Sequence, residues 1–236
     1  MKNPLKTNLL SATTASLHQE EMWSLYNRYY NSDKQAFSKR FDSNDYYAFY
    51  RDQDTLIGFT GFRIKLVETE YGKVQTLYIG QTVIDQLYRG NSLIPRTCCR
   101  IFAQLFLSRP FCPIYVWCDA LTYKPYLLFA NSVIDYFPHR EKALDPKNKA
   151  LIDHLGNHYY GANYNSNNGT VRKTSYVIND PTAIISKELR SHPDIDFYAK
   201  ANPRYAEGHG LITLAPITFR NFFYLLGKCI KKQFRR

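Results

Sequence analysis

The segment from residue 73 to residue 121 constrains the fold of this chain more than any other. Residues 73–84, KVQTLYIGQTVI, have the alternating pattern of a strand, and residues 112–121, CPIYVWCDAL, are apolar enough for a buried strand. Between them, a helix pattern runs from about Ser92 to Leu107. Because a strand–helix–strand passage of this length forms a crossover, the two strands are predicted to be parallel neighbours in one sheet.

The residues before this segment predict helices followed by an antiparallel meander. SLHQEEMWSLYNRYY is amphipathic, with Ser16 as its expected N-cap. An Asp-rich turn and a turn at Tyr71-Gly72 separate the strand patterns that follow. The expected elements are helices over residues 16–30, 32–41 and 122–137, a strand ending near Arg51 and a strand from Leu56 to about Glu68. The predicted fold class is therefore α+β, with a mixed, mostly antiparallel sheet flanked by helices.

The second part of the chain continues this pattern. It predicts a helix in DPKNKALIDHLGNHYY, two strands around an Asn/Gly turn in YYGANYNSNNGTVRKTSYVI, and a basic amphipathic helix at the end. That last helix either packs on the domain with a solvated basic face, or lies on an anionic membrane or docks a carrier protein. No Pro- or Gly-rich linker divides the chain. We therefore expect residues 1–138 to form the core and residues 139–236 to be a C-terminal elaboration of the same domain.

The charge balance points to an anionic partner. Lys and Arg number 31 against 20 Asp and Glu, which gives a formal net charge of +11. Nucleic acid, an anionic membrane, a phosphate-rich cofactor and an acidic carrier protein all fit such an excess. Most of the 20 Tyr and 15 Phe fall in strand patterns, so core packing is favoured over stacking on nucleic-acid bases.

Several function classes are disfavoured by the sequence. No window reaches the roughly 18 apolar residues of a membrane span, and no signal-peptide pattern opens the chain, so we expect a soluble, cytoplasmic protein. The five cysteines show no CxxC spacing and are interpreted as reduced thiols. His154 and His158 stand at i and i+4, but Gly156 lies between them and the glutamate of a zinc-protease motif is missing, so no metal is expected. His209 is interpreted as a turn histidine.

The stretch LYRGNSLIPRTCCRIF, residues 87–102, has the pattern of an anion-binding turn. A helix N-terminus that follows a strand and a tight turn presents unpaired N–H groups and partial positive charge. Arg89 adds a full charge, Gly90 permits close approach of the backbone, and Ser92 is placed to cap the helix or to bind an oxygen. The alternative is an ordinary capped helix beside a surface arginine.

The element order, with Tyr-Arg-Gly just before the helix, resembles the GNAT superfamily, the GCN5-related N-acyltransferases, over roughly residues 15 to 138. In that family the turn reads Arg/Gln-x-x-Gly-x-Gly/Ala and cradles the pyrophosphate of an acyl-CoA. Here it reads Arg89-Gly90-Asn91-Ser92-Leu93-Ile94, so Ser92 and Ile94 stand where the family has small residues. The resemblance implies acyl-CoA as the donor, or an acyl chain on the phosphopantetheine arm of an acidic acyl carrier protein, and no metal.

The resemblance also implies where the donor binds. The family has a splayed pair of parallel strands into which the pantetheine arm inserts, and here the strand ending in Gln81-Thr82-Val83-Ile84 would pair with the arm through its backbone. The thioester would then lie near Cys118 and Asp119. The predicted cofactor-binding residues are Thr82, Val83, Ile84, Arg89, Gly90, Asn91, Ser92, Leu93 and Ile94.

Two catalytic residues follow from the same resemblance. Asp119 is the candidate base, with a turn or helix-cap role as its alternative, and Glu68 and Asp85 are further candidates that fit a solvated surface better. The family often protonates the leaving thiolate with a tyrosine, but that position falls on Asn131 or Ser132 here. Tyr126, in the same predicted helix, is therefore the candidate acid.

The resemblance implies an N-acyltransferase. The aromatic C-terminal part favours a fatty acyl donor and an amine acceptor on an amino acid or peptide, such as a lysine-type side chain of a natural-product peptide. One alternative is an acetyl-CoA-dependent N-acetyltransferase of small molecules. The other is a non-catalytic basic module for nucleic acid or membrane, although no nucleic-acid partner is expected and membrane contact would be peripheral.

Overall fold

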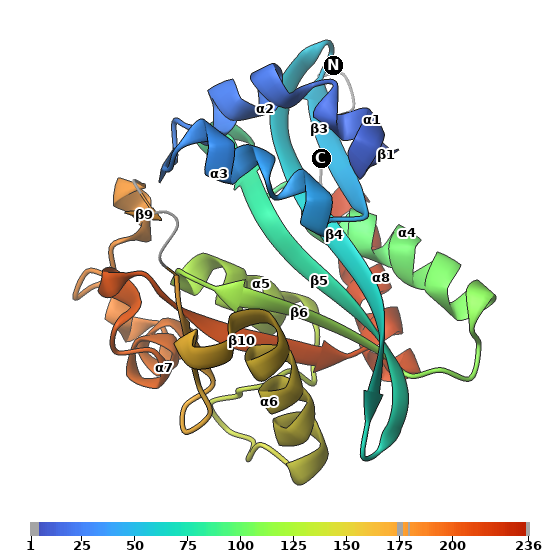
Figure 1. Cartoon of the computed structure of the whole chain (residues 1–236), viewed down its shortest axis with the longest axis vertical. Coiled ribbons are helices and arrows are strands. Elements are labelled where there is room, and N and C mark those ends of the chain that lie inside the picture. The colour runs from blue at the N-terminus through green and yellow to red at the C-terminus, as the bar shows by residue number, and fades with distance from the viewer. Residues whose placement is uncertain (1–4, 174–176, 179, 235–236) are drawn as a thin grey trace.

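The computed structural model describes residues 5–173, 177–178 and 180–234, and one twisted sheet runs through this part of the chain (Figure 1). The sheet has eight strands, in the order β1-β3-β4-β5-β6-β10-β8-β7. Two further strands, β2 and β9, pair with each other. The bounds are β1 Lys6–Ser11, β2 Tyr30–Asn31, β3 Tyr46–Asp52, β4 Thr55–Thr69, β5 Gly72–Ile84, β6 Ile114–Ala120, β7 Tyr164–Asn165, β8 Thr170–Arg172, β9 Val177–Ile178 and β10 His209–Pro216.

The β5–β6 pair is parallel, and the other strand pairs described for the large sheet are antiparallel. This confirms the crossover predicted from residues 73–121, and the fold class is α+β as predicted. The β3–β4–β5 meander is also confirmed. Strand β10 pairs antiparallel with Tyr115–Ala120 of β6, which places the second part of the chain in the same sheet as the first.

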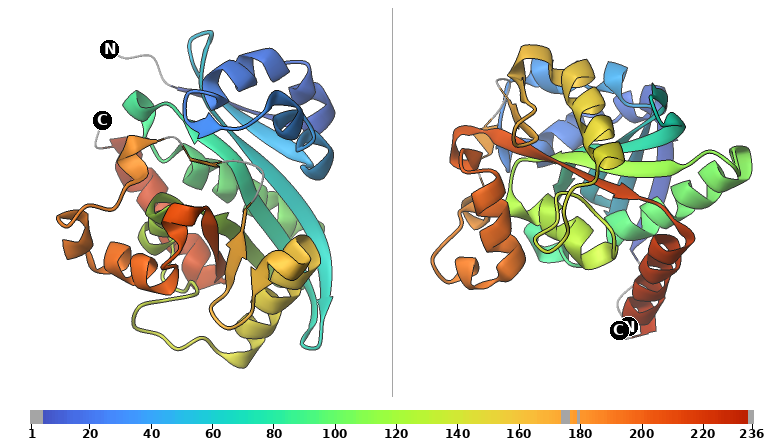
Figure 2. Two further views of the ribbon diagram at one scale, coloured as in Figure 1. Left: turned by 60° about the vertical axis from the view of Figure 1, so that its left-hand side comes forward. Right: turned by 90° about the horizontal axis from the view of Figure 1, so that it is seen from below.

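The helices cover both faces of this sheet. Buried side chains of α4, α5, α7 and α8 form one cluster on one face. On the other face α1–α3 pack over β3 and β4, and α6 packs over β6 and β10 (Figure 2). The bounds are α1 Ala12–Ser16, α2 Gln19–Tyr26, α3 Lys34–Ser38, α4 Leu93–Ser108, α5 Tyr123–Ser132, α6 Pro146–Tyr160, α7 Pro193–Ala201 and α8 Phe219–Phe234. Among these described helices, none is both long enough and apolar enough to cross a bilayer.

The N-terminal helix prediction was wrong in two respects. The expected helix over residues 16–30 is two short helices, α1 and α2, and Ser16 ends α1 instead of capping a helix. The cap of α1 is Ser11, whose Oγ accepts a hydrogen bond from the Thr14 N–H at 3.1 Å. The strand β1 was missed because its residues are largely exposed and have no clear alternation; pairing with β3 holds it in the sheet.

The helix predicted over residues 122–137 ends at Ser132, because another part of the chain captures the residues that follow. The N–H groups of Ile134 and Asp135 both donate to the side-chain oxygen of Asn221, at 2.9 and 3.0 Å. The predicted helix at residues 145–160, the strands around the Asn/Gly turn and the final helix are confirmed as α6, β7–β8 and α8. Residues 174–176 of the second predicted strand, and Arg235 and Arg236 of the last helix, lie outside the described residues.

Candidate functional site

The parallel strands β5 and β6 separate after a short paired stretch. Gln75–Tyr78 pair with Ile114–Trp117, and the described pairing stops there although β5 continues to Ile84 and β6 to Ala120. Gln81 has a left-handed φ of 44°, and the β4–β5 register shifts opposite it. Such a bulge bends a strand away from its neighbour. The result is the splayed parallel pair that the GNAT resemblance implied.

A cavity of about 1080 Å³ opens at this splay. Its walls come from the diverging end of β5, the loop that leads into α4, the C-terminal end of β6, and one side each of α5 and α8. All of the predicted cofactor-binding residues line it, as do Cys118 and Asp119. Tyr126, Glu68 and Asp85 are not among its lining residues. The structure thus brings the predicted binding residues together, and their role toward a donor stays a prediction.

Asp119 lies at the floor of the splay in a buried polar cluster. Tyr78 of β5 donates a hydrogen bond to one of its carboxylate oxygens at 3.0 Å, and Tyr160 of α6 donates to the other at 2.5 Å. The ammonium group of Lys173 forms an ion pair with the same carboxylate. Because Tyr78 and Asp119 belong to the two diverging strands, this contact closes one face of the gap between them.

The pKa of Asp119 shows which role the carboxylate can take. Burial by itself raises its pKa, but the Lys173 ammonium and the hydrogen bonds from Tyr160 and Tyr78 outweigh burial, so the pKa is lowered. A carboxylate with a lowered pKa and three donors is a weak proton acceptor. The geometry therefore favours Asp119 as a residue that orders the floor of the cavity over Asp119 as the general base.

Tyr126 lies in the core and not at the cavity. Its side chain is fully buried, and its hydroxyl donates to the carbonyl oxygen of Pro138 at 3.1 Å. Its ring packs against Tyr136, Phe197 and Tyr198. The structure gives this hydroxyl a structural partner and no access to a thioester at the splay. Sequence spacing placed it on the correct helix but could not tell which side of that helix faces the cavity.

The other two candidate bases have ordinary surface roles. Glu68 is exposed and lies 3.9 Å from the Lys73 ammonium. Asp85 accepts the Leu87 N–H at 3.1 Å as a cap, and it pairs with Arg28 at 3.2 Å. Glu68 is solvated as expected, whereas the Asp85 side chain is only 16% exposed and is held by its cap contact and ion pair.

The loop before α4 has the strained geometry of a tight turn. Gly90 has a φ of 83°, and Ser92 has a φ of 54° and a ψ of 30°. Serine holds this left-handed conformation at a cost of roughly 1–2 kcal/mol, whereas glycine adopts it freely, so the glycine that the family pattern has at the position of Ser92 has a conformational reason. The Ser92 side chain makes no capping hydrogen bond. Leu93 and Ile94 thus supply the first backbone N–H groups of α4, and Pro95 supplies none.

Arg89 is held by other parts of the protein. Its Nε donates to the Ile84 carbonyl oxygen at 3.0 Å, and its guanidinium lies 4.9 Å above the Tyr29 ring. The same guanidinium pairs with Asp180 at 2.9 Å, and the Lys124 ammonium is also 2.9 Å from that carboxylate. Burial raises the pKa of Asp180, but hydrogen bonds from Thr182 and Lys124 dominate and lower it to about 2. The charge of the predicted anion loop is therefore matched by a carboxylate from a distant segment.

The C-terminal helix reaches the same cavity, which the sequence did not indicate. Lys228, Lys231 and Lys232 line the cavity together with Leu225 and Cys229. The available signal was the i, i+3, i+4, i+7 spacing of residues 225, 228, 229 and 232, which puts two basic and two apolar side chains on one face of the helix. That pattern fits a helix packed on the domain and a helix on a membrane surface equally well. Only the tertiary structure shows that this face of α8 lines the cavity.

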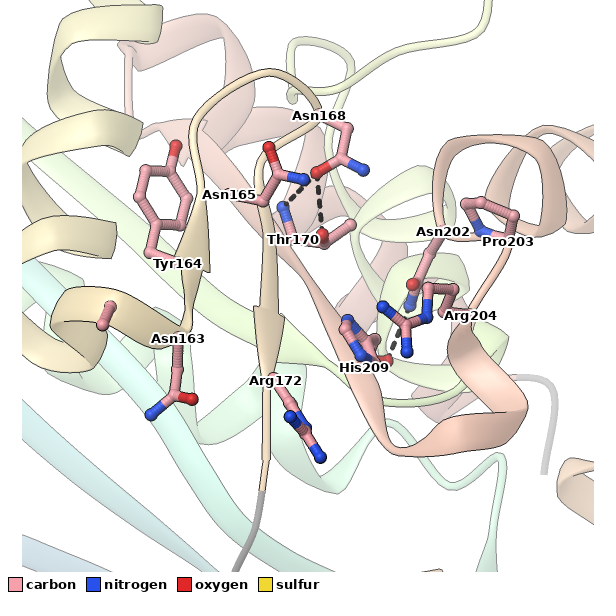
Figure 3. A pocket seen from close by; sticks show the side chains of 11 residues that line it. Asn163, Tyr164, Asn165, Asn168, Thr170, Arg172, Asn202, Pro203, Arg204 and His209 are labelled. Atoms are coloured by element: carbon pink, nitrogen blue, oxygen red, sulfur yellow. Dashed lines mark hydrogen bonds between the residues drawn. The ribbon is translucent and has the colours of Figure 1, made fainter.

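A second, smaller pocket of about 230 Å³ lies beside β10 and shares no lining residue with the first (Figure 3). His209 lines it as the first residue of β10, near Asn202, Arg172 and Arg204. Within the described chain, Asn202 Oδ1 and His209 Nε2 are buried without hydrogen-bond partners. Burial and the nearby Arg204 and Arg172 guanidinium groups lower the pKa of His209. His209 was interpreted as a turn histidine, but it begins strand β10 and lines this second pocket instead of the cavity at the splay.

The His154 and His158 rings stack on each other on α6, with their centroids 6.1 Å apart. The described residues contain no group of three or more His, Cys, Asp or Glu side chains that could hold a metal ion.

The sequence matches no family model and no curated protein. Several solved structures are similar. An aminoglycoside acetyltransferase from an uncultured soil metagenomic sample, in complex with sisomicin, is 16% identical, with a TM-score of 0.39 over 60% of this chain and 97% of the other. A ribosomal-protein-alanine N-acetyltransferase from Brucella melitensis is 13% identical, with a TM-score of 0.41 over 60% and 99%.

A GNAT family N-acetyltransferase from Escherichia coli, in complex with CoA, is 14% identical, with a TM-score of 0.38 over 54% of this chain and 68% of the other. All three structures are described as acetyltransferases. At these identities and TM-scores they carry no weight for activity, so function is argued from the cavity itself.

Proposed function

We propose that this protein is a GNAT-like N-acyltransferase, which moves an acyl group from a CoA or carrier-protein thioester to an amine. The observation that carries the proposal is the early separation of β5 and β6, with a cavity that extends from the splay to the N-terminus of α4. A splay of this kind offers a linear amide-containing ligand an unpaired strand edge, and the helix N-terminus offers its phosphates a partial positive charge.

The pantetheine arm is proposed to lie along β5 from Ile79 to Ile84. In the described chain this edge has no strand partner on the β6 side. The Thr82 carbonyl oxygen already accepts a hydrogen bond from the Tyr30 hydroxyl at 3.0 Å, so pairing with the arm would use other backbone groups of the strand. In this pose the thioester lies where the strands have diverged, near Cys118 and Asp119.

The proposed reaction is direct attack. The amine nitrogen bonds to the thioester carbonyl carbon, the carbon–sulfur bond breaks, and the electron pair leaves on sulfur while the nitrogen gives up a proton to solvent. A thiol has a pKa of about 8.5, so the thiolate can leave without a dedicated acid. Because the pKa of Asp119 is lowered, we propose that Asp119 orients Tyr78 and Tyr160 at the floor and that the amine enters already neutral.

The size of the cavity supports a long acyl group. Its volume of about 1080 Å³ is slightly above the roughly 300–1,000 Å³ of ordinary ligand pockets. Leu121, Leu127, Leu128 and Phe129 contribute apolar side chains to its wall. Burying a chain of about ten carbons would contribute roughly 8 kcal/mol at about 0.8 per CH₂. We therefore propose a fatty acyl donor and, as acceptor, an amine of an amino acid or peptide such as a lysine-type side chain.

The test is a ladder of acyl-CoAs from acetyl to palmitoyl, with thermal shift and bound mass measured for each. We expect the stabilisation to grow with chain length, because each added CH₂ that is buried tightens binding to the folded state. Equal shifts for all lengths would rule out the fatty donor and leave acetyl transfer. If no acyl-CoA shifts the melting temperature, the same ladder on acyl carrier protein decides whether any thioester is bound.

A further inference from the structure

We propose that the C-terminal helix α8 supplies the main phosphate-binding side chains of this site, with Lys228, Lys231 and Lys232 contacting the nucleotide phosphates of a CoA donor. The inference rests on the proposed function and extends it to an element outside the region of family resemblance. It starts from the fact that all three lysines line the cavity beside the loop that precedes α4.

The loop by itself has little free charge to offer a phosphate. The Arg89 guanidinium and the Lys124 ammonium both pair with Asp180. Ser92 contributes no capping contact, and Pro95 removes one N–H group from the first turn of α4. A multiply charged phosphate group therefore needs further cations close to the loop.

Helix α8 is fixed in place well enough to supply them. The buried side chain of Asn221 accepts the N–H groups of Ile134 and Asp135 and donates to the carbonyl oxygens of Asp135 and Pro216, at 2.8 and 2.7 Å. Further along the helix, Leu225 and Cys229 are buried in the main core cluster. The backbone of the lysine-bearing turns is thereby held against α4 and α5.

The three lysines differ in how they are engaged. Lys228 donates to the Asn131 carbonyl oxygen at 2.8 Å, which uses one of the three N–H bonds of its ammonium. Lys231 and Lys232 are exposed, and no carboxylate of the described chain lies within ion-pair distance of either. Both are free to bind an anion without first breaking an ion pair.

The cavity lining is electropositive, and three of its cations lie on α8. The described cavity lining contains five cations, against the carboxylates of Asp119 and Asp180. The pKa of the Cys229 thiol on α8 is lowered, first by a hydrogen bond with Cys99 and then by the Arg96 and Lys232 charges, against the opposing effect of burial. The cations are Arg89, Lys124, Lys228, Lys231 and Lys232.

The chemistry of the ligand follows from this placement. Lysine ammonium groups are point charges that suit phosphate, and a terminal phosphate carries about −1.5 to −2 near pH 7. The cations line a concave cavity that continues to the splay, so a small ligand with both a phosphorylated head and a linear arm fits better than a membrane surface. CoA has such a head and arm, while pantetheine has the arm alone.

The experiment compares CoA, 3′-dephospho-CoA and pantetheine by isothermal titration on the full chain. The variant is Lys231→Gln/Lys232→Gln, and Lys147→Gln is the control, because Lys147 is an exposed lysine on α6, on the other face of the sheet. We expect the double variant to bind CoA about tenfold more weakly, or ~1.4 kcal/mol. It should lose less affinity for dephospho-CoA and none for pantetheine, while the control matches the wild type.

Salt and charge reversal sharpen the comparison. The affinity for CoA should fall with ionic strength in the wild type and less steeply in the double variant. Lys231→Glu/Lys232→Glu should lose more affinity than the glutamine variant.

Unchanged CoA affinity in both variants overturns the inference and leaves the proposed function standing. Equal losses for pantetheine also overturn it, since they show damage to the arm site. If the wild type binds none of the three, the proposed CoA donor and this inference are both wrong.

Discussion

Two carboxylates line the cavity, Asp119 and Asp180, and their cationic partners differ in exposure to solvent. Asp119 at the floor pairs with Lys173, and these side chains are only 7% and 14% exposed. Asp180 at the mouth is 11% exposed, but its partners Arg89 and Lys124 are 29% and 30% exposed. The cationic partners of Asp180 are thus about twice as exposed to water and ligands as Lys173, the cationic partner of Asp119. We infer that the floor pair is structural and that the mouth pairs can exchange with a phosphate.

The largest effect is expected at the floor. Asp119→Ala leaves the buried Lys173 ammonium without its counter-charge, and breaking a buried pair in this way costs about 3–5 kcal/mol. Urea unfolding would measure the loss. The double variant Asp119→Asn/Lys173→Met removes both charges and should recover most of the stability. If Asp119→Ala costs less than about 1 kcal/mol, the pair is not part of the framework.

The Asp119–Lys173 pair is also expected to make the stability of the fold depend on pH at the acid end. The pKa of Asp119 is lowered in the folded state, so its stabilising contribution is fully present above the ordinary aspartate pKa of about 3.9 and is lost as the pH falls through the lower folded value. Wild-type stability should therefore fall below about pH 4, and Asp119→Asn should show a shallower fall. Equal slopes of unfolding free energy against pH would show that Asp119 does not titrate in this range.

The next effect is expected at the base of α8. Asn221→Ala leaves two N–H groups and two carbonyl oxygens without their buried partner. Each group so exposed costs about 1–3 kcal/mol when water cannot replace the bond. We expect a loss of a few kcal/mol in unfolding free energy together with weaker CoA binding. Asn221→Asp keeps the acceptor but places a buried carboxylate oxygen against the carbonyl oxygens of Asp135 and Pro216, so it should not recover this loss.

At the mouth of the cavity, Asp180→Asn is expected to strengthen CoA binding, whereas Asn221→Ala weakens it. Asp180→Asn frees Arg89 and Lys124 for phosphate, so CoA affinity should rise a few-fold, while stability changes by less than about 1 kcal/mol because the partners are partly exposed. The same substitution in the Lys231→Gln/Lys232→Gln background should restore part of the lost affinity. Weaker CoA binding by Asp180→Asn would mean that Asp180 contacts the donor directly.

The smallest effect is expected for Tyr126→Phe. Its hydroxyl donates to Pro138 inside the core, so the variant should lose about 0.5–1.5 kcal/mol of stability and keep its kcat within about twofold. Steady-state kinetics with an acyl-CoA and an amine would measure this. A fall in kcat of tenfold or more, with an unchanged KM, would restore Tyr126 as the catalytic acid.

Local sequence pattern was sufficient to predict those parts of the fold that depend on neighbouring residues in the chain. The strand patterns of β5 and β6 and the helix between them predicted the parallel pair, and the family resemblance implied the donor-binding residues Thr82 to Ile84 and Arg89 to Ile94, which line one cavity. The same reasoning could not tell that Tyr126 lies in the core, because a helix period does not show which face is buried; its role as an acid stays a prediction. That reasoning also failed for β1, whose stability comes from its pairing with β3.

The sequence by itself determined the sheet order around β5 and β6, the position of the loop before α4 and the preference for an anionic partner. Strand and helix periods, turn residues and net charge are all local or additive properties, so they can be counted along the chain. The tertiary structure alone decided that Asp180 meets Arg89, that Lys173 meets Asp119 and that the lysines of α8 line the cavity. These contacts join residues far apart in sequence. They depend on how buried side chains pack in three dimensions, and a short window of sequence does not contain that information.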